Sequence, residues 1–283
     1  MRYAATIGFF DGVHRGHTFL IQQLIRQAQQ DGLGAMLITF DNHPRQTLEG
    51  KSPALLLTRE EREQRLRANG VNQIIEFRFD VIKGMTAEDF LHILHTQCEV
   101  DELLMGYDHR FGCDHLTNLA DYQAAGSRAD VRVLNIGQSP DGDISSTKIR
   151  NALAQGNLQE ANTMLGYPYF LSGEVVHGKH IGTQLGFPTA NLAVAAEKLI
   201  PLPGVYAATC STGSTCLVNI GTNPTVGDNN QLTIEVHIPD FQGDLYGQRL
   251  TVELIRYLRP DKRFGNEDQL KQQILLDLQQ LNN

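Results

Sequence analysis

Several features that would place this chain in a functional class are missing from its sequence. No apolar run reaches the roughly 18 residues that a membrane-spanning helix needs, and no basic-then-apolar leader opens the chain. Lysine and arginine (24) are outnumbered by aspartate and glutamate (32), which leaves a net charge of −8. Nucleic-acid-binding proteins carry a basic stripe. We therefore expect neither nucleic acid nor membrane as a partner, although a local positive pocket could still bind a polyphosphate.

Metal and nucleotide signatures are also scarce. The four cysteines form no Cys-x-x-Cys pair, which predicts reduced thiols and a cytoplasmic location rather than a zinc cluster. The phosphate-binding loop Gly-x-x-x-x-Gly-Lys-[Ser/Thr] is absent, and Gly-x-Gly-x-x-Gly is absent from the first turn. These absences exclude the P-loop and the dinucleotide-binding fingerprint as explanations of any nucleotide site.

Two patterns divide the 283 residues, a length that suggests about two domains. In the first half, β-prone runs alternate with helical stripes, which predicts a parallel, doubly wound, Rossmann-like sheet. Thr58 and Glu61 form a capping box at the start of one helix, and Gly70 ends it. The predicted strands are 3–9, 35–40, 74–79, 103–106 and 131–136, and the predicted helices are 18–30, 58–70, 87–97 and 146–154.

From residue 170 onward, short β-rich runs punctuated by glycine and proline predict an antiparallel sheet or small β-barrel. A final helix over about 266–281 has one apolar face that can pack on this barrel. The boundary is expected near 156–166, with a first domain at 1–157 and a second at 158–283. The predicted strands are 173–176, 205–209, 215–220, 232–238 and 250–257.

The stretch GFFDGVHRGH, residues 8–17, lies between the first predicted strand and the first predicted helix. Ligands of parallel sheets bind beyond the carboxyl ends of the strands, glycine permits close approach to a phosphate, and a helix N-terminus attracts anions. His14 and His17 would share one helix face and could stabilise charge that develops in phosphoryl or nucleotidyl transfer. Two histidines three apart are, on their own, more often surface or capping residues.

Four motifs in order resemble the nucleotidylyltransferase module of bacterial FAD synthetases. GFFDGVHRGH resembles the family's G-x-F-D-G-x-H-x-G-H, and FDNHP (40–44) resembles its F-x-P-H-P. GYDHRFG (106–112) resembles G-x-D-F-x-F-G, and ISSTKIR (144–150) resembles S-S-T-x-I-R. Asn42 stands where the family usually has proline, and His109 stands at an aromatic position.

This resemblance implies adenylylation of FMN by ATP, a reaction in which the protein chiefly positions the substrates and neutralises charge. It implies that His14, His17 and Arg150 are catalytic. The residues implied to bind ATP are Gly8, Phe10, Asp11, His14, His17, Ser146, Thr147 and Arg150, and those implied to bind FMN are Asn42, His43, Asp108 and Arg110. The residues alone describe SSTKIR as a serine-capped helix with a basic turn, which is compatible with a phosphate role.

The second half resembles riboflavin kinases. GKHIGTQLGFPTANL (178–192) is similar to the signature G-x-x-x-G-R-x-L-G-F-P-T-A-N-L, with Thr183 where arginine is usual. GVYA (204–207), NIGTNPT (219–225), EVHIPDFQGDLYG (235–247) and LRPDKRF (258–264) continue the resemblance. Taken together, the two halves resemble a bifunctional riboflavin kinase/FAD synthetase over nearly the whole chain.

The kinase resemblance implies that Glu235 removes the proton of the riboflavin 5′-hydroxyl and that Thr189 and Asn191 hold the magnesium ion bound to ATP. The residues implied to bind ATP or flavin in this site are Gly178, Lys179, Gly182, Gly186, Thr189, Asn191, Arg259 and Phe264. From the pattern alone, Glu235 is better explained as a residue on the solvated face of a strand, and residues 188–191 are typical of a simple turn.

The expected function is therefore phosphorylation of riboflavin to FMN, followed by adenylylation of FMN to FAD with release of pyrophosphate. Two alternatives stay open at this point: an FMN adenylyltransferase whose barrel only binds flavin, and a non-catalytic flavin-binding module. The expected ligands are riboflavin, FMN, FAD, ATP and Mg²⁺. The expected state is a monomer or a weakly self-associating chain.

Overall fold

A computed structural model describes residues 1–50, 52–106, 109–137, 139–178, 182, 186–222, 232–262 and 264–282. The chain divides into two compact units, Met1–Ser146 and Thr147–Asn283. The predicted domain boundary between residues 157 and 158 stays a prediction.

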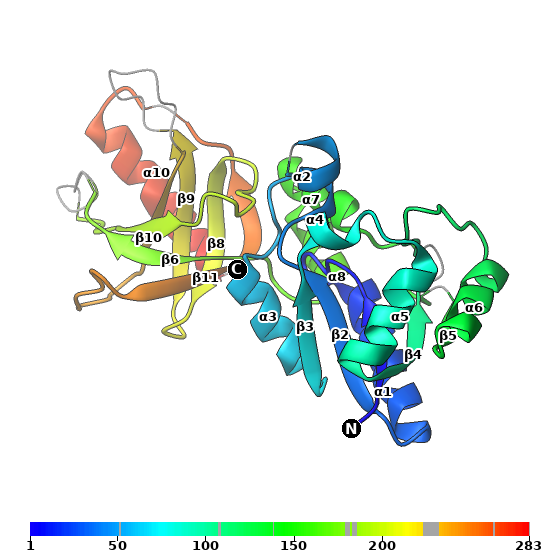
Figure 1. Cartoon of the computed structure of the whole chain (residues 1–283). Helices are drawn as coiled ribbons and strands as arrows, with labels where there is room; N and C mark the ends of the chain where they lie inside the picture. The colour runs from blue at the N-terminus through cyan, green and yellow to red at the C-terminus, as the bar shows by residue number, and fades with distance from the viewer. Residues whose placement is uncertain are drawn as a thin grey trace. The chain divides into compact units, whose positions relative to one another are not determined.

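The first unit is a parallel sheet in the order β3-β2-β1-β4-β5 with helices on both faces (Figure 1), which confirms the predicted doubly wound fold. Its strands are β1 (Tyr3–Ile7), β2 (Gly34–Phe40), β3 (Gln73–Phe77), β4 (Val100–Met105) and β5 (Arg132–Asn135). Its helices are α1 (Arg15–Gln30), α2 (Pro44–Glu49), α3 (Arg59–Ala68), α4 (Phe79–Ile82), α5 (Ala87–Cys98) and α6 (Leu119–Arg128). The strand order reverses at β1, so the loops after β1 and β4 flank the switch point where such sheets bind ligands.

The core of this unit follows from the burial of its central strands. All seven residues of β2 are buried, as expected for a parallel strand covered on both faces. Ile7, Ile38 and Leu103 pack in one cluster with residues of α5 and α6. Helix α1 buries Ile21, Leu24 and Ala28, which lie on one stripe of the helix. Helices α2, α4 and α6 were not predicted, because the first two are short and the third has few large apolar residues.

The second unit contains a closed barrel in the order β10-β7-β6-β11-β8-β9, with antiparallel neighbours throughout, and it confirms the predicted barrel. Its strands are β6 (Phe170–Val176), β7 (Ala190–Val194), β8 (Gly204–Cys210), β9 (Thr215–Thr222), β10 (Leu232–His237) and β11 (Arg249–Arg259). Its helices are α8 (Leu158–Leu165), α10 (Glu267–Gln279) and the short η1 (Gln280–Asn282), and α7 (Ser146–Ala154) begins at the end of the first unit. Helix α8 and strand β7 were not predicted.

Alternation along the barrel strands separates a buried interior from a polar exterior. On β9, Cys216, Val218 and Ile220 are fully buried, whereas Asn219 between them is half-buried. Successive side chains of a strand point to opposite faces, so Asn219 lies on the outer face. This assignment decides which polar residues of the neighbouring strands can meet a ligand.

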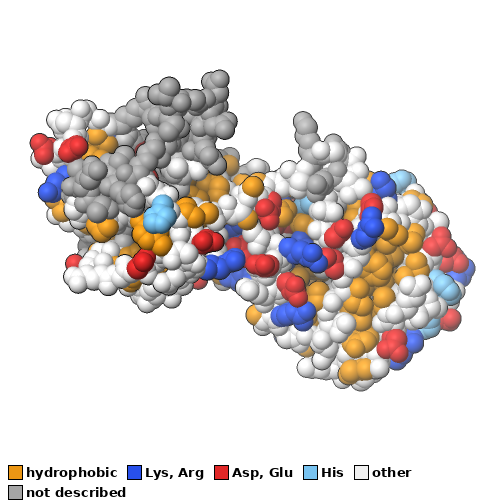
Figure 2. Space-filling model, turned by 60° about the vertical axis from the view of Figure 1, so that its left-hand side comes forward, with side chains coloured by type: hydrophobic (Ala, Val, Ile, Leu, Met, Phe, Trp, Pro, Cys, Tyr) orange, Lys and Arg blue, Asp and Glu red, His pale blue; other side chains and the backbone are white. Residues whose placement is uncertain are grey.

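The surface carries both signs of charge. On the face drawn in Figure 2, acidic and basic side chains are interspersed over short distances. Among the residues that the structure describes, no helix combines the length and the apolar character needed to cross a bilayer.

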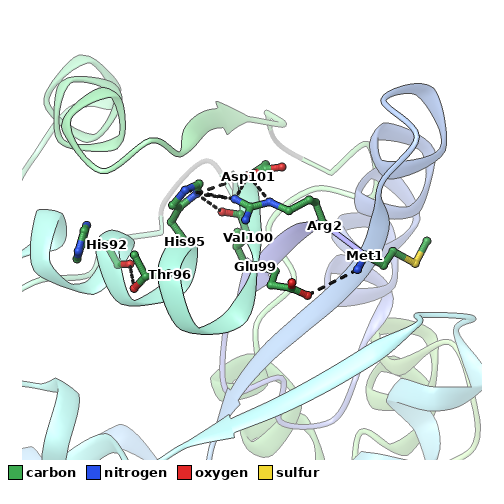
Figure 3. A network of polar contacts seen from close by, with 8 residues as sticks. All are labelled: Met1, Arg2, His92, His95, Thr96, Glu99, Val100 and Asp101. Carbon is green, nitrogen blue, oxygen red and sulfur yellow. Dashed lines mark hydrogen bonds and ion pairs between the residues drawn. The ribbon is translucent and has the colours of Figure 1, made fainter.

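A polar network joins the start of β1 to α5 and β4 (Figure 3). The Arg2 Nε donates to Asp101 Oδ1 at 2.8 Å, and the same guanidinium lies 2.8 Å from His95 Nδ1. The amino group of Met1 lies 3.7 Å from a carboxylate oxygen of Glu99. The network lies where the parallel strands begin, at the edge of the sheet opposite to the predicted ligand site.

Candidate active sites

The loop after β1 is shaped by residues in the left-handed backbone region. The Gly8 N–H donates to the Ile38 carbonyl at 3.0 Å, which holds the loop against β2. Phe10, Gly12 and Val13 then have φ values of 56°, 82° and 35°. A side chain with a β-carbon is strained there, so the conformations of Phe10 and Val13 must be enforced by their surroundings. Strain of this kind is typical of ligand-binding loops.

His14 and His17 lie together at the start of α1. Their rings are stacked, with centroids 3.6 Å apart and planes inclined by 18°. His14 is the N-cap of the helix, and its Nδ1 accepts a hydrogen bond from the His17 backbone N–H at 3.4 Å. The rings of Phe10 and His17 are arranged edge to face, with their centroids 5.3 Å apart. The predicted pair is therefore both a helix cap and a compact imidazole cluster.

Burial keeps this pair neutral. It lowers the pKa of His14 to about 4, and burial together with His14 lowers the pKa of His17 well below its ordinary value. The His17 Nδ1 is buried and has no hydrogen-bond partner among the described residues. A buried polar atom without a partner is uncommon and requires an explanation, and a ligand oxygen or bound water would supply one.

Asp11 ties this loop to two other segments. Its carboxylate accepts hydrogen bonds from the backbone N–H groups of Leu56 and Leu57, both at 3.1 Å. Its carbonyl accepts one from the Ser146 hydroxyl at 2.8 Å. Asp11 is only 3% exposed, so these bonds hold the loop in a protected position. The contacts show Asp11 shaping the loop, and its implied part in binding ATP stays a prediction.

The residues implied to bind FMN follow two neighbouring strands. His43 comes after β2. Its ring packs edge to face with the ring of Phe9, with centroids 4.8 Å apart, and Phe9 lies in the loop that carries the histidine pair. Asn42 beside it is exposed. Arg110 follows β4, is exposed, and donates to the carbonyl of the preceding residue. Asp108 lies outside the described residues.

The remaining residues implied to bind ATP lie at the start of α7. Ser146 belongs to the first unit and is bonded to Asp11 as described above. Thr147 and Arg150 belong to the second unit, three residues apart on one face of the helix. Thr147 is exposed and Arg150 is half-buried.

The second candidate site is a row of polar residues across three barrel strands. Glu235 of β10 pairs directly with Asn191 of β7 on one side and with Asn219 of β9 on the other. Directly opposed residues of antiparallel strands share a face, with β-carbons about 4.5–5.5 Å apart. All three are half-buried on the outer face of the barrel. The pattern of the sequence did not single out Asn219, because its position depends on strand register.

Two glycines lie close to Asn191 of this row and to Thr189. A β-carbon at Gly178 would lie 2.1 Å from Asn191 Nδ2, and one at Gly182 would lie 3.3 Å from Thr189 Oγ1. Gly186 has a φ of 87°, which favours glycine. Gly178 and Gly182 therefore lie against the two residues implied to hold a metal. Lys179 and Thr183 lie outside the described residues.

Thr189 and Asn191 offer a hydroxyl and an amide oxygen, which are hard, neutral donors. Mg²⁺ in phosphate-binding sites takes only one or a few protein oxygens and completes its shell with phosphate and water. The donor set therefore fits a magnesium ion carried by a nucleotide.

A cavity of about 330 Å³ lies beside Thr189. Its walls include Val175, Val236, Phe241 and Tyr246, and Thr189 contributes a polar edge. A mostly apolar pocket with a few polar groups is typical of small-molecule sites. No motif predicted this cavity, since its walls come from three separate segments.

Arg259, implied to bind a ligand, is engaged within the protein. Its Nε lies 3.0 Å from Asp277 Oδ1 and its terminal nitrogen lies 2.8 Å from Oδ2, so the pair joins β11 to α10. Asp277 is 2% exposed. Phe264 lies with its ring centroid 5.8 Å from the Arg259 guanidinium. The structure shows an anchor for the C-terminal helix, and ligand binding by Arg259 and Phe264 stays a prediction.

Comparisons with known proteins agree with this division. The FAD synthetase family model matches residues 1–148, and the riboflavin kinase family model matches residues 165–283. A bifunctional riboflavin kinase/FMN adenylyltransferase of Listeria monocytogenes is 36% identical over 96% of this chain and 89% of its own. One of Escherichia coli K12 is 37% identical over the same shares. The chain belongs to the family of bifunctional riboflavin kinase/FMN adenylyltransferases.

A solved structure has the same fold over the full length. A crystal structure from Streptococcus pneumoniae, described as a macrolide-efflux protein, superposes with a TM-score of 0.89 at 30% identity and covers 100% of this chain and 94% of its own.

Proposed function

We propose that this chain phosphorylates riboflavin to FMN in the barrel unit and adenylylates FMN to FAD in the sheet unit, with ATP as the donor in both reactions. The observation that carries the proposal is that each unit presents its own built site. The first has a neutral histidine pair at the switch point of a parallel sheet, and the second has a carboxylate between two amides on the barrel.

In adenylyl transfer, an oxygen of the FMN phosphate attacks the α-phosphorus of ATP. The new O–P bond replaces the bond to the α,β-bridging oxygen, which leaves with its electron pair as pyrophosphate. The attacking phosphate is already ionised, so no base is needed. His14 and His17, neutral at pH 7, donate N–H groups to phosphate oxygens, and the N-terminus of α1 adds its dipole. Ser146, Thr147 and Arg150 are assigned to the triphosphate.

In phosphoryl transfer, the riboflavin 5′-oxygen attacks the γ-phosphorus, and the bond to the β,γ-bridging oxygen breaks to release ADP. The hydroxyl is a weak nucleophile, and Glu235 is assigned as the base that accepts its proton. Asn191 and Asn219 lie on both sides of Glu235 and can orient it or the ribityl hydroxyls by hydrogen bonding. When bound, Mg²⁺ would be held by Thr189 and Asn191 and would neutralise phosphate charge.

The cavity beside Thr189 is the proposed site for the base of the kinase ATP. Its apolar walls suit a planar ring, and Thr189 at its edge is also a proposed metal ligand, so the phosphates would lie near Thr189. The flap glycines Gly178, Gly182 and Gly186 would then cover the phosphates.

The remaining assignments are also proposals. We assign residues 1–157 to the adenylyltransferase domain and 158–283 to the kinase domain, which is close to the two family matches. All four cysteines are free thiols, which supports a cytoplasmic location. We propose a monomer or weakly self-associating chain without nucleic-acid or membrane partners.

Two parallel incubations test the proposal. The purified chain is supplied with ATP and Mg²⁺, and with either riboflavin or FMN, and products are separated over time. FAD from riboflavin, with FMN as an intermediate, is the expected result. FAD from FMN only would indicate a single-activity adenylyltransferase, and no product from either flavin would indicate a binding module.

A further inference from the structure

Arg62 is a buried arginine that neither reaction explains. It lies one turn into α3, just after the capping box of Thr58 and Glu61, and its side chain is 3% exposed. Burial lowers the pKa of its guanidinium, and the carboxylates of Asp11 and Glu76 oppose this effect. A buried charge is costly unless it is paired and hydrogen-bonded, so its contacts indicate its purpose.

The guanidinium contacts the ends of neighbouring strands. Its carbon lies 4.1 Å from the centroid of the Phe9 ring, in the loop after β1. A terminal nitrogen donates to the carbonyl of Phe40, the last residue of β2, at 3.1 Å. A carboxylate oxygen of Glu76 on β3 lies 3.9 Å away. One planar group thus joins three parallel strands at their carboxyl edge.

Both strand-end contacts lead to proposed ligand-binding residues. Phe9 lies in the loop that carries His14 and His17, and it also packs against the His43 ring. Phe40 directly precedes the segment that carries Asn42 and His43. The first loop is assigned to ATP and the second to FMN. The contacts of Arg62 therefore set the spacing between the sides of the site that hold the two substrates.

We propose that Arg62 is a positioning residue for adenylyl transfer, which holds the FMN loop against the ATP loop without touching either substrate. This inference rests on the proposed function. A guanidinium can stack its face on Phe9 while its edge donates to Phe40, whereas a lysine ammonium is a point donor and cannot do both. A lysine at position 62 would therefore keep the positive charge but would not hold both loops in place.

The test uses the full chain with Arg62→Lys and Arg62→Met. KM and kcat are measured separately for FMN and ATP, and riboflavin phosphorylation is measured in the same preparation. We expect kcat/KM for FMN to fall on the order of 10²-fold in both variants, because a displacement of about 1 Å has effects of that size. The KM for ATP should stay near the wild-type value, because Asp11 still holds its loop, and phosphorylation should be unchanged.

Arg59→Met is the matched control. Arg59 lies on the same helix and pairs with the same Glu76 at 2.5 Å, but its side chain is 69% exposed. The Arg59→Met variant should leave kcat and the KM values for FMN and ATP unchanged. If both Arg62 variants lose the melting transition of the first unit, Phe9→Leu replaces them. It removes the ring that contacts both the Arg62 guanidinium and the His43 ring, and it should lower kcat/KM for FMN.

The inference is overturned if a folded Arg62 variant has the wild-type kcat/KM for FMN. The same holds for Phe9→Leu, if this variant has to replace the Arg62 variants. An equal rise in both KM values also overturns it, because general damage to the unit would give that result. A wild-type chain that makes no FAD from FMN overturns the proposed function and this inference together.

Discussion

The two candidate sites handle charge in opposite ways. In the sheet unit, the central groups are histidines that burial keeps neutral, packed on a loop with strained backbone. In the barrel unit, the central group is a half-buried carboxylate between two amides on a regular strand surface. The difference follows from the nucleophile: an ionised phosphate needs stabilisation of developing charge, whereas a hydroxyl needs a base.

The largest expected effect comes from removal of the base. Glu235→Gln preserves the shape of the side chain and should lower kcat for riboflavin phosphorylation by about 10²–10⁴-fold. FMN adenylylation should be unchanged, since the residue lies in the other unit. Glu174→Gln, an exposed position on the adjoining barrel surface, is the control. A loss below tenfold with unchanged substrate binding would leave Glu235 as a structural strand residue.

His17→Ala should produce the converse pattern. Loss of one preorganised stabiliser of developing charge costs about 3–4 kcal/mol, or about 10²–10³-fold in FMN adenylylation. Riboflavin phosphorylation serves as the internal control, so FMN should accumulate with little FAD. Thermal melting checks that the first unit is folded. FAD formation at the wild-type rate would show that His17 has only a packing role.

The fold was more predictable than the sites because periodicity is a local property. The capping box of Thr58 and Glu61 was predicted from four residues and is present. The first strand was predicted two residues too long, because Gly8 and Phe9 continue its apolar pattern while the backbone turns. Strand β7 was missed because proline and asparagine at 188–191 are typical of turns.

The contacts that complete the sites depend on tertiary structure. Helix α3 is rich in glutamate and arginine, so its pattern predicts a solvated helix, yet Arg62 is buried beneath Phe9. Asn219 reaches Glu235 only through the register of β9 and β10. The motif resemblance located His14 and His17, but the stacking of their rings depends on how the loop after β1 folds.

A pH titration of stability sharpens the comparison further. The pKa of His14 is about 4 in the folded chain and about 6.5 when exposed, so the unfolded state binds more protons between these values. The first unit should therefore lose stability as the pH falls from about 6.5 to 4, by up to about 3 kcal/mol from this residue. His14→Asn keeps a capping side chain but cannot titrate, so it should reduce the slope by the share of His14, while His17 still contributes.

Urea unfolding of the first unit at several pH values measures this slope. His92→Asn removes an exposed histidine of α5 and should keep the wild-type slope. If His14→Asn and the wild-type chain lose stability in parallel, the imidazole is not held neutral by burial.

The smallest effect is expected at the opposite edge of the same sheet. Arg2 and Asp101 pair across an open surface, with side chains 41% and 35% exposed (Figure 3). Exposed pairs contribute little, because water and salt screen them. Arg2→Gln should therefore leave both activities unchanged and lower the unfolding free energy of the first unit less than Arg62→Met does. The difference in unfolding free energy between Arg2→Gln and the wild-type chain should vanish at about 1 M salt, where the Debye length is about 3 Å. A salt-independent loss, or any change in FMN adenylylation, would show that this edge is coupled to the active-site edge through β1 and β4.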